Sequence, residues 1–211
     1  MKKKNQKSLC AAVCCLAAFV LWTLLVLTVD VQSIGPTGSA VGFATLNGWF
    51  HELTGVHMGL YNLTDRLSLI PVAAVMGFGL LGLWQWIKRK SIWSVDRGIL
   101  VLGGYYIAVL AFYVLFEMIE INFRPVLIQG ILEASYPSST TLLVLTVMPV
   151  SAKEACRRVK NSRWILYCSC GFTGFMVIAR LLSGVHWITD IIGGVLLSGT
   201  LVLLYSAFSE E

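Results

Sequence analysis

Long apolar runs constrain the fold of this chain more than any other feature. Each run holds about 20 residues, the length that an α-helix needs to cross a bilayer. Of the 211 residues, 57% are hydrophobic and only 13% are charged, and the mean hydropathy is +0.78. Because the runs are continuous and do not alternate with polar residues, they predict a helical membrane bundle and not a barrel.

Six spans are predicted: Leu9–Val29, Leu67–Ile87, Ile99–Ile119, Ser138–Ser151, Trp164–Ser183 and Trp187–Phe208. The fourth is short, although Pro137 fits the first turn of a helix.

The basic start of the chain resembles a signal peptide, but the apolar run is too long and lacks a small-residue cleavage site, so we expect the first span to be retained. No repeat or linker is visible, and residues 1–211 are expected to form one domain.

Basic residues indicate the orientation of the bundle. Three segments carry thirteen of the sixteen, namely Lys2, Lys3, Lys4 and Lys7; Lys88, Arg89, Lys90 and Arg97; and Lys153, Arg157, Arg158, Lys160 and Arg163. By the positive-inside rule, these segments and both termini are expected on the cytoplasmic side of the cell membrane. The net charge of +5 then reflects orientation, and a nucleic-acid partner has no support because the charge is divided among short loops.

The longest outer segment runs from Asp30 to Arg66. Within it, Phe43, Leu46, Trp49 and Phe50 are spaced for a short amphipathic helix that lies in the outer interface. The same segment contains His51 and His57, for which a solvated interfacial position is the default expectation.

Polar and ionisable residues gather where three stretches reach the predicted outer edge of the bundle. They are Glu117, Glu120 and Arg124; Ser138, Ser139 and Thr140; and Arg180, His186 and Asp190. A charged group at the centre of a membrane costs roughly 2.5 to 3.5 kcal/mol, so this concentration needs a cause.

Each stretch has chemistry suited to phosphate. His186 and Asp190 are four residues apart and share a helix face, so the carboxylate can orient the imidazole as a nucleophile or base. Arg124 and Arg180 can clamp a phosphoryl group, and the N–H groups at Ser138 and Ser139 favour an anion. The alternative from the residues alone is a structural Arg180–Asp190 ion pair beside an interfacial histidine.

Three motifs together resemble the type 2 phosphatidic acid phosphatase superfamily, in its membrane-bound lipid phosphatase branch. They are Arg124-Pro125, Tyr136-Pro137-Ser138-Ser139-Thr140, and Arg180-x5-His186-x3-Asp190. The resemblance implies that His186 attacks phosphorus and forms a phosphohistidine with help from Asp190. It also implies that Arg124, Arg180 and Ser138 hold the phosphate of a lipid phosphate or diphosphate, and that no metal or other cofactor is needed.

The chain departs from that family pattern at three positions. Glu117 replaces a lysine, Thr140 replaces the histidine that protonates the leaving oxygen, and Ala179 replaces a serine. A general acid contributes about 10²- to 10⁴-fold, so its loss should cost roughly 3 to 5.5 kcal/mol when an alkoxide leaves. Thr140 also leaves the second step, water attack on the phosphohistidine, without the family's base, and the candidates to replace that base are Glu117, Glu120, His51 and His57.

The absence of a general acid at Thr140 predicts the class of substrate. A lipid diphosphate expels a phosphate monoester with a last pKa of about 6, which needs little protonation, whereas a phosphatidate expels an alcohol. An isoprenoid diphosphate such as undecaprenyl diphosphate is therefore expected. Two alternatives stay open: a catalytically weak homologue that binds or transports a lipid phosphate without hydrolysis, and a small ion or proton carrier using Glu117, Asp190 and Arg180.

Overall fold

Long helices account for most of the structure, a computed structural model that describes the backbone of residues 3–209 and the side chains of residues 5–209. The α-helices are α1 (Lys3–Thr28), α2 (Ala44–Thr54), α3 (Met58–Leu67), α4 (Leu69–Arg89), α5 (Arg97–Met118), α6 (Ser139–Arg158), α7 (Arg163–Leu182) and α8 (Ile188–Ser209). Short 3-10 turns, η1 (Pro36–Gly38) and η2 (Ile92–Ser94), lie in two of the connections. Within the described residues, extended backbone pairs only as isolated bridges, which confirms the all-α prediction.

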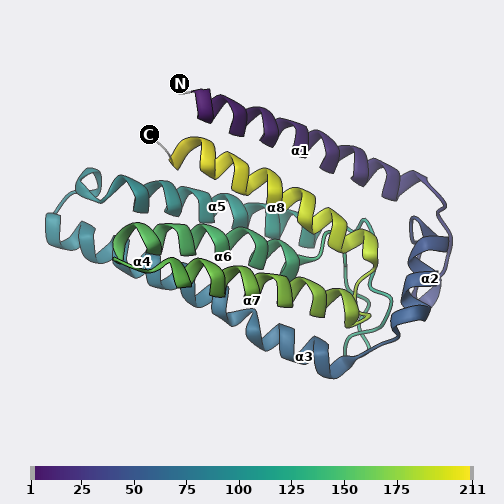
Figure 1. Cartoon of the computed structure of the whole chain (residues 1–211). Coiled ribbons are helices and arrows are strands. Elements are labelled where there is room, and N and C mark those ends of the chain that lie inside the picture. Colours follow the sequence, from purple (N-terminus) through teal and green to yellow (C-terminus); the bar gives the residue numbers. More distant parts are fainter. Residues whose placement is uncertain (1–2, 210–211) are drawn as a thin grey trace.

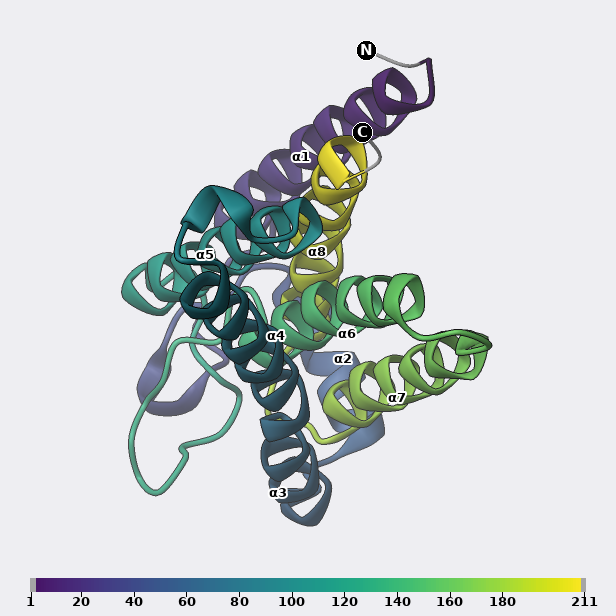
Figure 2. The same cartoon turned by 90° about the vertical axis from the view of Figure 1, so that its left-hand side faces the viewer.

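The long helices lie side by side, with the two ends of the chain at one end of the bundle (Figure 1). Helix α6 is central and packs against α4, α5, α7 and α8. Seen from the end that holds the termini, α1 lies outside this group and runs along α8 (Figure 2). The connections before α6 and before α8, which carry the candidate site residues, meet at the opposite end of the bundle.

Within the described residues, five segments have the length and composition to span a membrane: Asn5–Thr28, Met58–Arg89, Arg97–Met118, Arg163–Leu182 and Ile188–Ser209. They correspond to five of the six predicted spans. The sixth, α6, is also 20 residues long, but it extends beyond the predicted end at Ser151 through Lys153, Glu154, Arg157 and Arg158. Its polarity is tolerated because neighbouring helices surround it, so little of its surface has to face lipid.

The outer segment forms two helices, whereas the sequence predicted one. Helix α2 confirms the predicted short helix, and Trp49 on it is 59% exposed. Helix α3 was not predicted, because the second span was expected to begin at Leu67. Only Ser68, which has helical backbone angles, separates α3 from α4. The continuous stretch from Met58 to Arg89 has 32 residues, and its first turns therefore reach the end of the bundle where the site lies.

Tyr136 anchors the loop before α6 in the core. Its side chain is 1% exposed, its ring stacks on Phe19 with centroids 6.3 Å apart, and its hydroxyl lies 2.8 Å from Thr23 Oγ1. A Cβ atom on Gly193 of α8 would lie 2.6 Å from the Tyr136 ring. Since both faces and the hydroxyl of this ring are constrained, only glycine allows α8 to pass at this distance.

We predict that Gly193→Ala destabilises the protein by about 1 to 3 kcal/mol, because the overpacked ring cannot move aside. The matched control is Gly77→Ala, at a helical glycine whose added Cβ would meet nothing within 4 Å. Thermal unfolding in a neutral detergent should show a lower Tm for Gly193→Ala than for Gly77→Ala. Equal Tm values would show that the close approach of α8 to Tyr136 does not constrain the fold.

Candidate active site

The first turn of α8 is held from three directions. The Trp187 indole N–H donates to the Phe123 carbonyl at 2.7 Å, and the Trp22 indole N–H donates to the Thr189 carbonyl at 3.1 Å. From α2, the Asn47 amide donates to the Thr189 hydroxyl at 3.0 Å. These bonds join α1, α2 and the loop after α5 to one helical turn, and they fix the direction in which Asp190 points.

Asp190 is fully buried and accepts hydrogen bonds on both carboxylate oxygens. Oδ2 accepts from the Trp187 backbone N–H at 2.9 Å, as an acidic residue does in a capping box. Oδ1 accepts from the Asn122 side-chain amide at 3.4 Å. The carboxylate is therefore held by the start of its own helix and by the loop after α5.

His186 lies one helical turn from Asp190 and is 3% exposed. Its Nδ1 is 3.7 Å from Asp190 Oδ2, too far for a hydrogen bond. Neither ring nitrogen has a hydrogen-bond partner among the described residues. Burial lowers the pKa of His186 well below its usual value, and the positive charges of Arg124 and Arg180 lower it further. The imidazole is consequently neutral at neutral pH, the form that can act as a nucleophile.

The turn before His186 is tied to the α2–α3 connection. Gly184 has a φ of +68°, and an added Cβ would collide with the Gly55 carbonyl oxygen. Beside it, the His57 backbone N–H donates to the Ser183 carbonyl at 2.9 Å. Glycine is required here for both its backbone angles and its size, and the close contact brings α3 next to the end of α7.

Two buried arginines share the aromatic ring of Tyr61, which lies on α3. Arg180 is 2% exposed and Arg124 is 7% exposed. The Arg180 guanidinium carbon is 4.6 Å from the centre of the Tyr61 ring, and that of Arg124 is 5.8 Å from it. Arg180 also donates to the Thr64 hydroxyl at 3.1 Å. An aromatic face partly compensates a desolvated cation, so α3 supports both positive charges.

Arg124 lies close to the carboxylate of Glu133. Its Nε lies 3.1 Å from Glu133 Oε2, but the angle is not that of a hydrogen bond, since Arg124 Nε and Nη1 both lack a hydrogen-bond partner in the described part of the chain. Arg180 Nε also lacks a hydrogen-bond partner in that part of the chain. Buried donors of this kind are rare and call for an explanation such as a missing ion.

A small hairpin-like loop positions Arg124. The Arg124 N–H donates to the Glu133 carbonyl at 3.0 Å, and the Ser135 N–H donates to the Asn122 carbonyl at 2.8 Å. At the tip, Gln129 and Gly130 both have positive φ, 52° and 81°, as in the tight turns that join hairpin strands. This loop brings Asn122 and Arg124 from the end of α5 to the first turn of α8.

The second motif reaches the same place through the start of α6. The Ser138 N–H donates to the Asp190 carbonyl at 3.1 Å, and its hydroxyl accepts from the Thr141 N–H at 3.4 Å. The serine side chain thus caps α6. Ser139 and Thr140 follow in the first turn, and Thr140 is 7% exposed. Glu117 is exposed and lines a small hollow together with Ser135 and Ser139.

The structure brings together five of the residues that the sequence singled out: Arg124, Ser138, Arg180, His186 and Asp190. The partners of Arg180 and Asp190 differ from the structural ion pair that was the alternative, because Arg180 bonds Thr64 and Asp190 bonds Trp187 and Asn122. No group of three side chains suited to a metal ion occurs in residues 5–209.

Sequence reasoning missed the residues that support this cluster. They are Tyr61, Thr64, Asn122 and Glu133. Tyr61 and Thr64 are three residues apart, the spacing of one helix face, but no helix was predicted in this part of the outer segment. Gln129-Gly130 between apolar residues was an available signal for the hairpin-like turn.

We predict that Tyr61→Leu weakens the binding of inorganic phosphate or vanadate about 3- to 30-fold, because the ring that supports both guanidiniums is lost. Tyr61→Phe keeps the ring and should bind within about threefold of the wild-type protein. Isothermal titration of the purified protein in detergent measures both affinities. Equal weakening in the two variants would show that the ring face has no role.

A second prediction concerns acid stability. Because the folded pKa of His186 is lowered, the unfolded chain binds more protons below about pH 6.5, and stability falls as the pH decreases through that value. Between pH 7.5 and 5.5 we expect His186→Gln to lose about 1 kcal/mol less stability than the wild-type protein. Chemical unfolding at both pH values measures the difference, and an equal loss in both proteins would contradict a neutral buried imidazole.

Comparison with known proteins agrees with the geometry. The sequence pattern of the PAP2 superfamily matches residues 72–211. Phosphatidylglycerophosphatase B of Bacillus subtilis (strain 168) is 23% identical over 203 residues, which cover 92% of this chain and 93% of that protein. The crystal structure of a transmembrane PAP2 type phosphatidylglycerolphosphate phosphatase from Bacillus subtilis shares the fold, with a TM-score of 0.64, 19% identity, and coverage of 95% of this chain and 96% of that one. The resemblance carried by the three motifs is therefore confirmed, and with it the prediction of a lipid phosphate hydrolase: the chain belongs to the PAP2 superfamily.

Proposed function

We propose that this protein is an outward-facing membrane phosphatase that hydrolyses an isoprenoid diphosphate, such as undecaprenyl diphosphate, through a phosphohistidine on His186. One observation carries the proposal more than any other. Arg124, Arg180 and His186 are buried together, and each has polar nitrogen atoms without a hydrogen-bond partner in the described part of the chain. A phosphate group would supply acceptors for the guanidiniums and an electrophile for the imidazole.

The remaining polar groups support this chemistry. A ring nitrogen of neutral His186 attacks phosphorus, and Asp190, 3.7 Å from Nδ1, stabilises the positive charge that develops on the ring. This separation is expected to shorten to a hydrogen bond when the substrate binds, because catalytic hydrogen bonds are often long before the substrate is present. At the start of α6, the Ser138 hydroxyl is already used for capping, so the N–H groups of Ser139 and Thr140 are left to face the anion.

The expectation of a diphosphate substrate depends on Thr140. The family histidine at this place protonates the leaving oxygen, whereas a threonine hydroxyl does not ionise near neutral pH. Hydrolysis of a diphosphate expels a phosphate monoester and needs little protonation. Hydrolysis of a lipid phosphomonoester expels an alkoxide and should be slower by about 10²- to 10⁴-fold without an acid.

A second candidate substrate is phosphatidylglycerophosphate, because both Bacillus subtilis relatives are named for that activity. This phosphomonoester would need a proton donor. Water attack on the phosphohistidine would also need a base, and of the four candidates for that base Glu117 has the clearest placement, since it lines the hollow that contains Ser139 and Ser135. The His57 ring instead contacts the Thr54 carbonyl at 2.9 Å in the exposed outer segment.

Two further functions need no catalysis. A weak homologue that binds or transports a lipid phosphate would use the same arginines, and the carboxylate of Glu117 would slow hydrolysis by repelling the substrate. An ion or proton carrier would need the charged groups to form a relay. The closed arrangement of Arg180 on Tyr61 and Thr64 favours anion binding over such a relay.

The proposed orientation follows from the distribution of basic residues. The N-terminal segment and the connections after α4 and α6 lie at the end of the bundle opposite the candidate site (Figure 1). In the sequence, thirteen of the sixteen basic residues lie in these segments or on the helix ends that adjoin them, and cytoplasmic loops are the ones enriched in Lys and Arg. The site would accordingly open to the outer face of the cell membrane.

We predict that the purified protein releases phosphate from undecaprenyl diphosphate at least about tenfold faster than from phosphatidic acid. Free phosphate is measured in mixed micelles under matched conditions, and His186→Ala is the control that should abolish release. Equal or faster turnover of phosphatidic acid would contradict the substrate assignment. Tight binding of the diphosphate without release would instead favour the non-hydrolysing homologue.

A further inference from the structure

The hairpin-like loop between α5 and α6 has an uncharged tip. Residues 125–132 lie between Arg124 and Glu133 and read Pro-Val-Leu-Ile-Gln-Gly-Ile-Leu. In this tip, Leu127 is 42% exposed and Ile131 is 62% exposed. The loop projects sideways from the bundle (Figure 2) and does not extend beyond α2 along the bundle (Figure 1). Two large apolar side chains are therefore presented beside the end of the bundle that holds the candidate site.

The backbone of the tip satisfies its own polar groups. The Ile128 N–H donates to the Ile131 carbonyl at 3.1 Å, and the Ile131 N–H donates to the Ile128 carbonyl at 2.9 Å. At the base of the loop, the Arg124 N–H donates to the Glu133 carbonyl at 3.0 Å. Backbone groups without a partner cost several kcal/mol in lipid. Because these groups are already paired, the tip can leave water at a lower cost.

The loop begins at the lipid-facing end of α5. This helix belongs to a segment with the length and composition to span a membrane, and Val114, Leu115 and Met118 in its last turns are exposed. Ile119, the first residue after the helix, is exposed as well. The apolar surface that α5 presents to lipid therefore continues along the chain into the loop.

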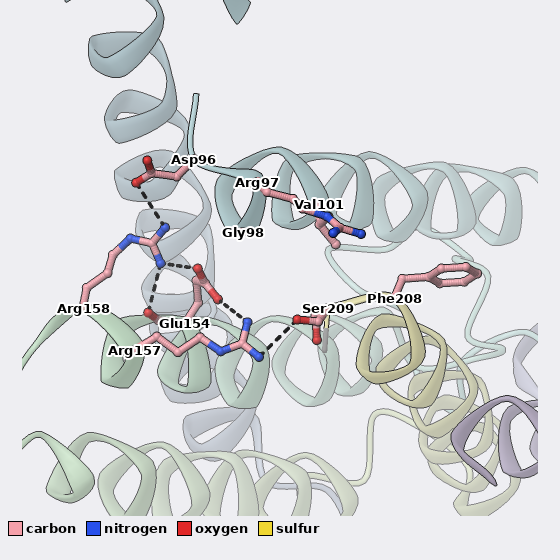
Figure 3. Close-up of a pocket in the computed structure, with 9 residues that line it drawn as sticks. All are labelled: Asp96, Arg97, Gly98, Val101, Glu154, Arg157, Arg158, Phe208 and Ser209. Carbon is pink, nitrogen blue, oxygen red and sulfur yellow. Dashed lines mark hydrogen bonds and ion pairs between the residues drawn. The ribbon is translucent and has the colours of Figure 1, made fainter. Parts of the chain in front are cut away.

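The opposite end of the bundle has a different character. There, Glu154 pairs with Arg157 and Arg158, and Arg158 also pairs with Asp96 (Figure 3). The sequence around the connections at that end is rich in Lys and Arg, as is typical of loops that face water on the cytoplasmic side. The uncharged tip departs from this pattern, which favours a surrounding other than water.

We propose that the tip of the hairpin-like loop inserts into the lipid leaflet on the side of the candidate active site, with Leu127 and Ile131 among the acyl chains. The partner is the bilayer and not a second copy of the chain, because the loop follows directly on the lipid-facing end of α5. Insertion would anchor the loop that carries Arg124 into the site. The proposal does not depend on which lipid phosphate is hydrolysed.

The test is photochemical crosslinking of the full-length protein in phosphatidylcholine nanodiscs. Ile131 is replaced by the photoreactive residue p-benzoylphenylalanine, and mass spectrometry identifies what becomes attached after illumination. We expect a phosphatidylcholine adduct that is joined through an acyl chain. The matched control has the same replacement at Lys160, an exposed residue in the connection between α6 and α7, and should give little adduct.

A second measurement places p-benzoylphenylalanine at Leu127 and changes Ile131. Ile131→Asp should lower the yield of lipid adduct about tenfold, because a carboxylate resists entry into lipid, whereas Ile131→Val should keep it within about twofold. Both changes are at an exposed position and should leave the fold intact. The proposal is overturned if Lys160 and Ile131 give equal adduct, if attachment occurs only at the headgroup, or if Ile131→Asp has no effect. A crosslinked protein dimer in place of the lipid adduct would overturn it in favour of a second copy.

Discussion

Burial of two like charges is the constraint on which the rest of the structure depends. Arg124 and Arg180 are both nearly inaccessible and share one aromatic ring. Two cations in a water-poor site repel each other and lose their hydration, so each must find compensation from fixed groups. The protein provides Tyr61 and Thr64 on α3, Glu133 on the hairpin-like loop and Asp190 on α8. The compensation is incomplete, and a bound phosphate would complete it.

This requirement explains the irregular end of the bundle. The supporting groups come from α3, from the loop after α5, and from the first turns of α6 and α8. Helix α2 and Trp22 of α1 hold the start of α8 through Thr189. Each outer element therefore positions a charged or polar group of the site, and the helical bundle beneath supplies a rigid base.

Helix α6 joins the two charged ends of the protein. It begins at the second motif and ends in the Glu154 network with Arg157 and Arg158. A helix with such ends is too polar to face lipid along its length, which accounts for its central place among α4, α5, α7 and α8. The fourth span was predicted too short because the polar residues at the end of α6 lower its hydropathy. The hydropathy of a sequence cannot show that neighbouring helices shield such residues from lipid.

The sequence predicted features that depend on nearby residues, such as spans and motifs. It did not predict contacts between residues that are far apart in the chain. Apolar runs predicted four spans closely and the second span from Leu67 onward, and the three motifs predicted that Arg124, Ser138, Arg180, His186 and Asp190 would meet. Tyr61 and Asn122 could not be predicted, because their roles depend on contacts with Arg180 and Asp190, which are far away in the chain. Likewise, the His186–Asp190 spacing indicated a shared helix face, but not that Asp190 would bond the Trp187 backbone.

The most direct test of the central claim is an experimental structure of the protein with vanadate, a phosphate analogue. The account predicts that vanadate lies between the Arg124 and Arg180 guanidiniums, within bonding distance of a His186 ring nitrogen, and accepts from the nitrogens that now lack partners. Vanadate bound elsewhere, or bound to the arginines with His186 turned away, would contradict it.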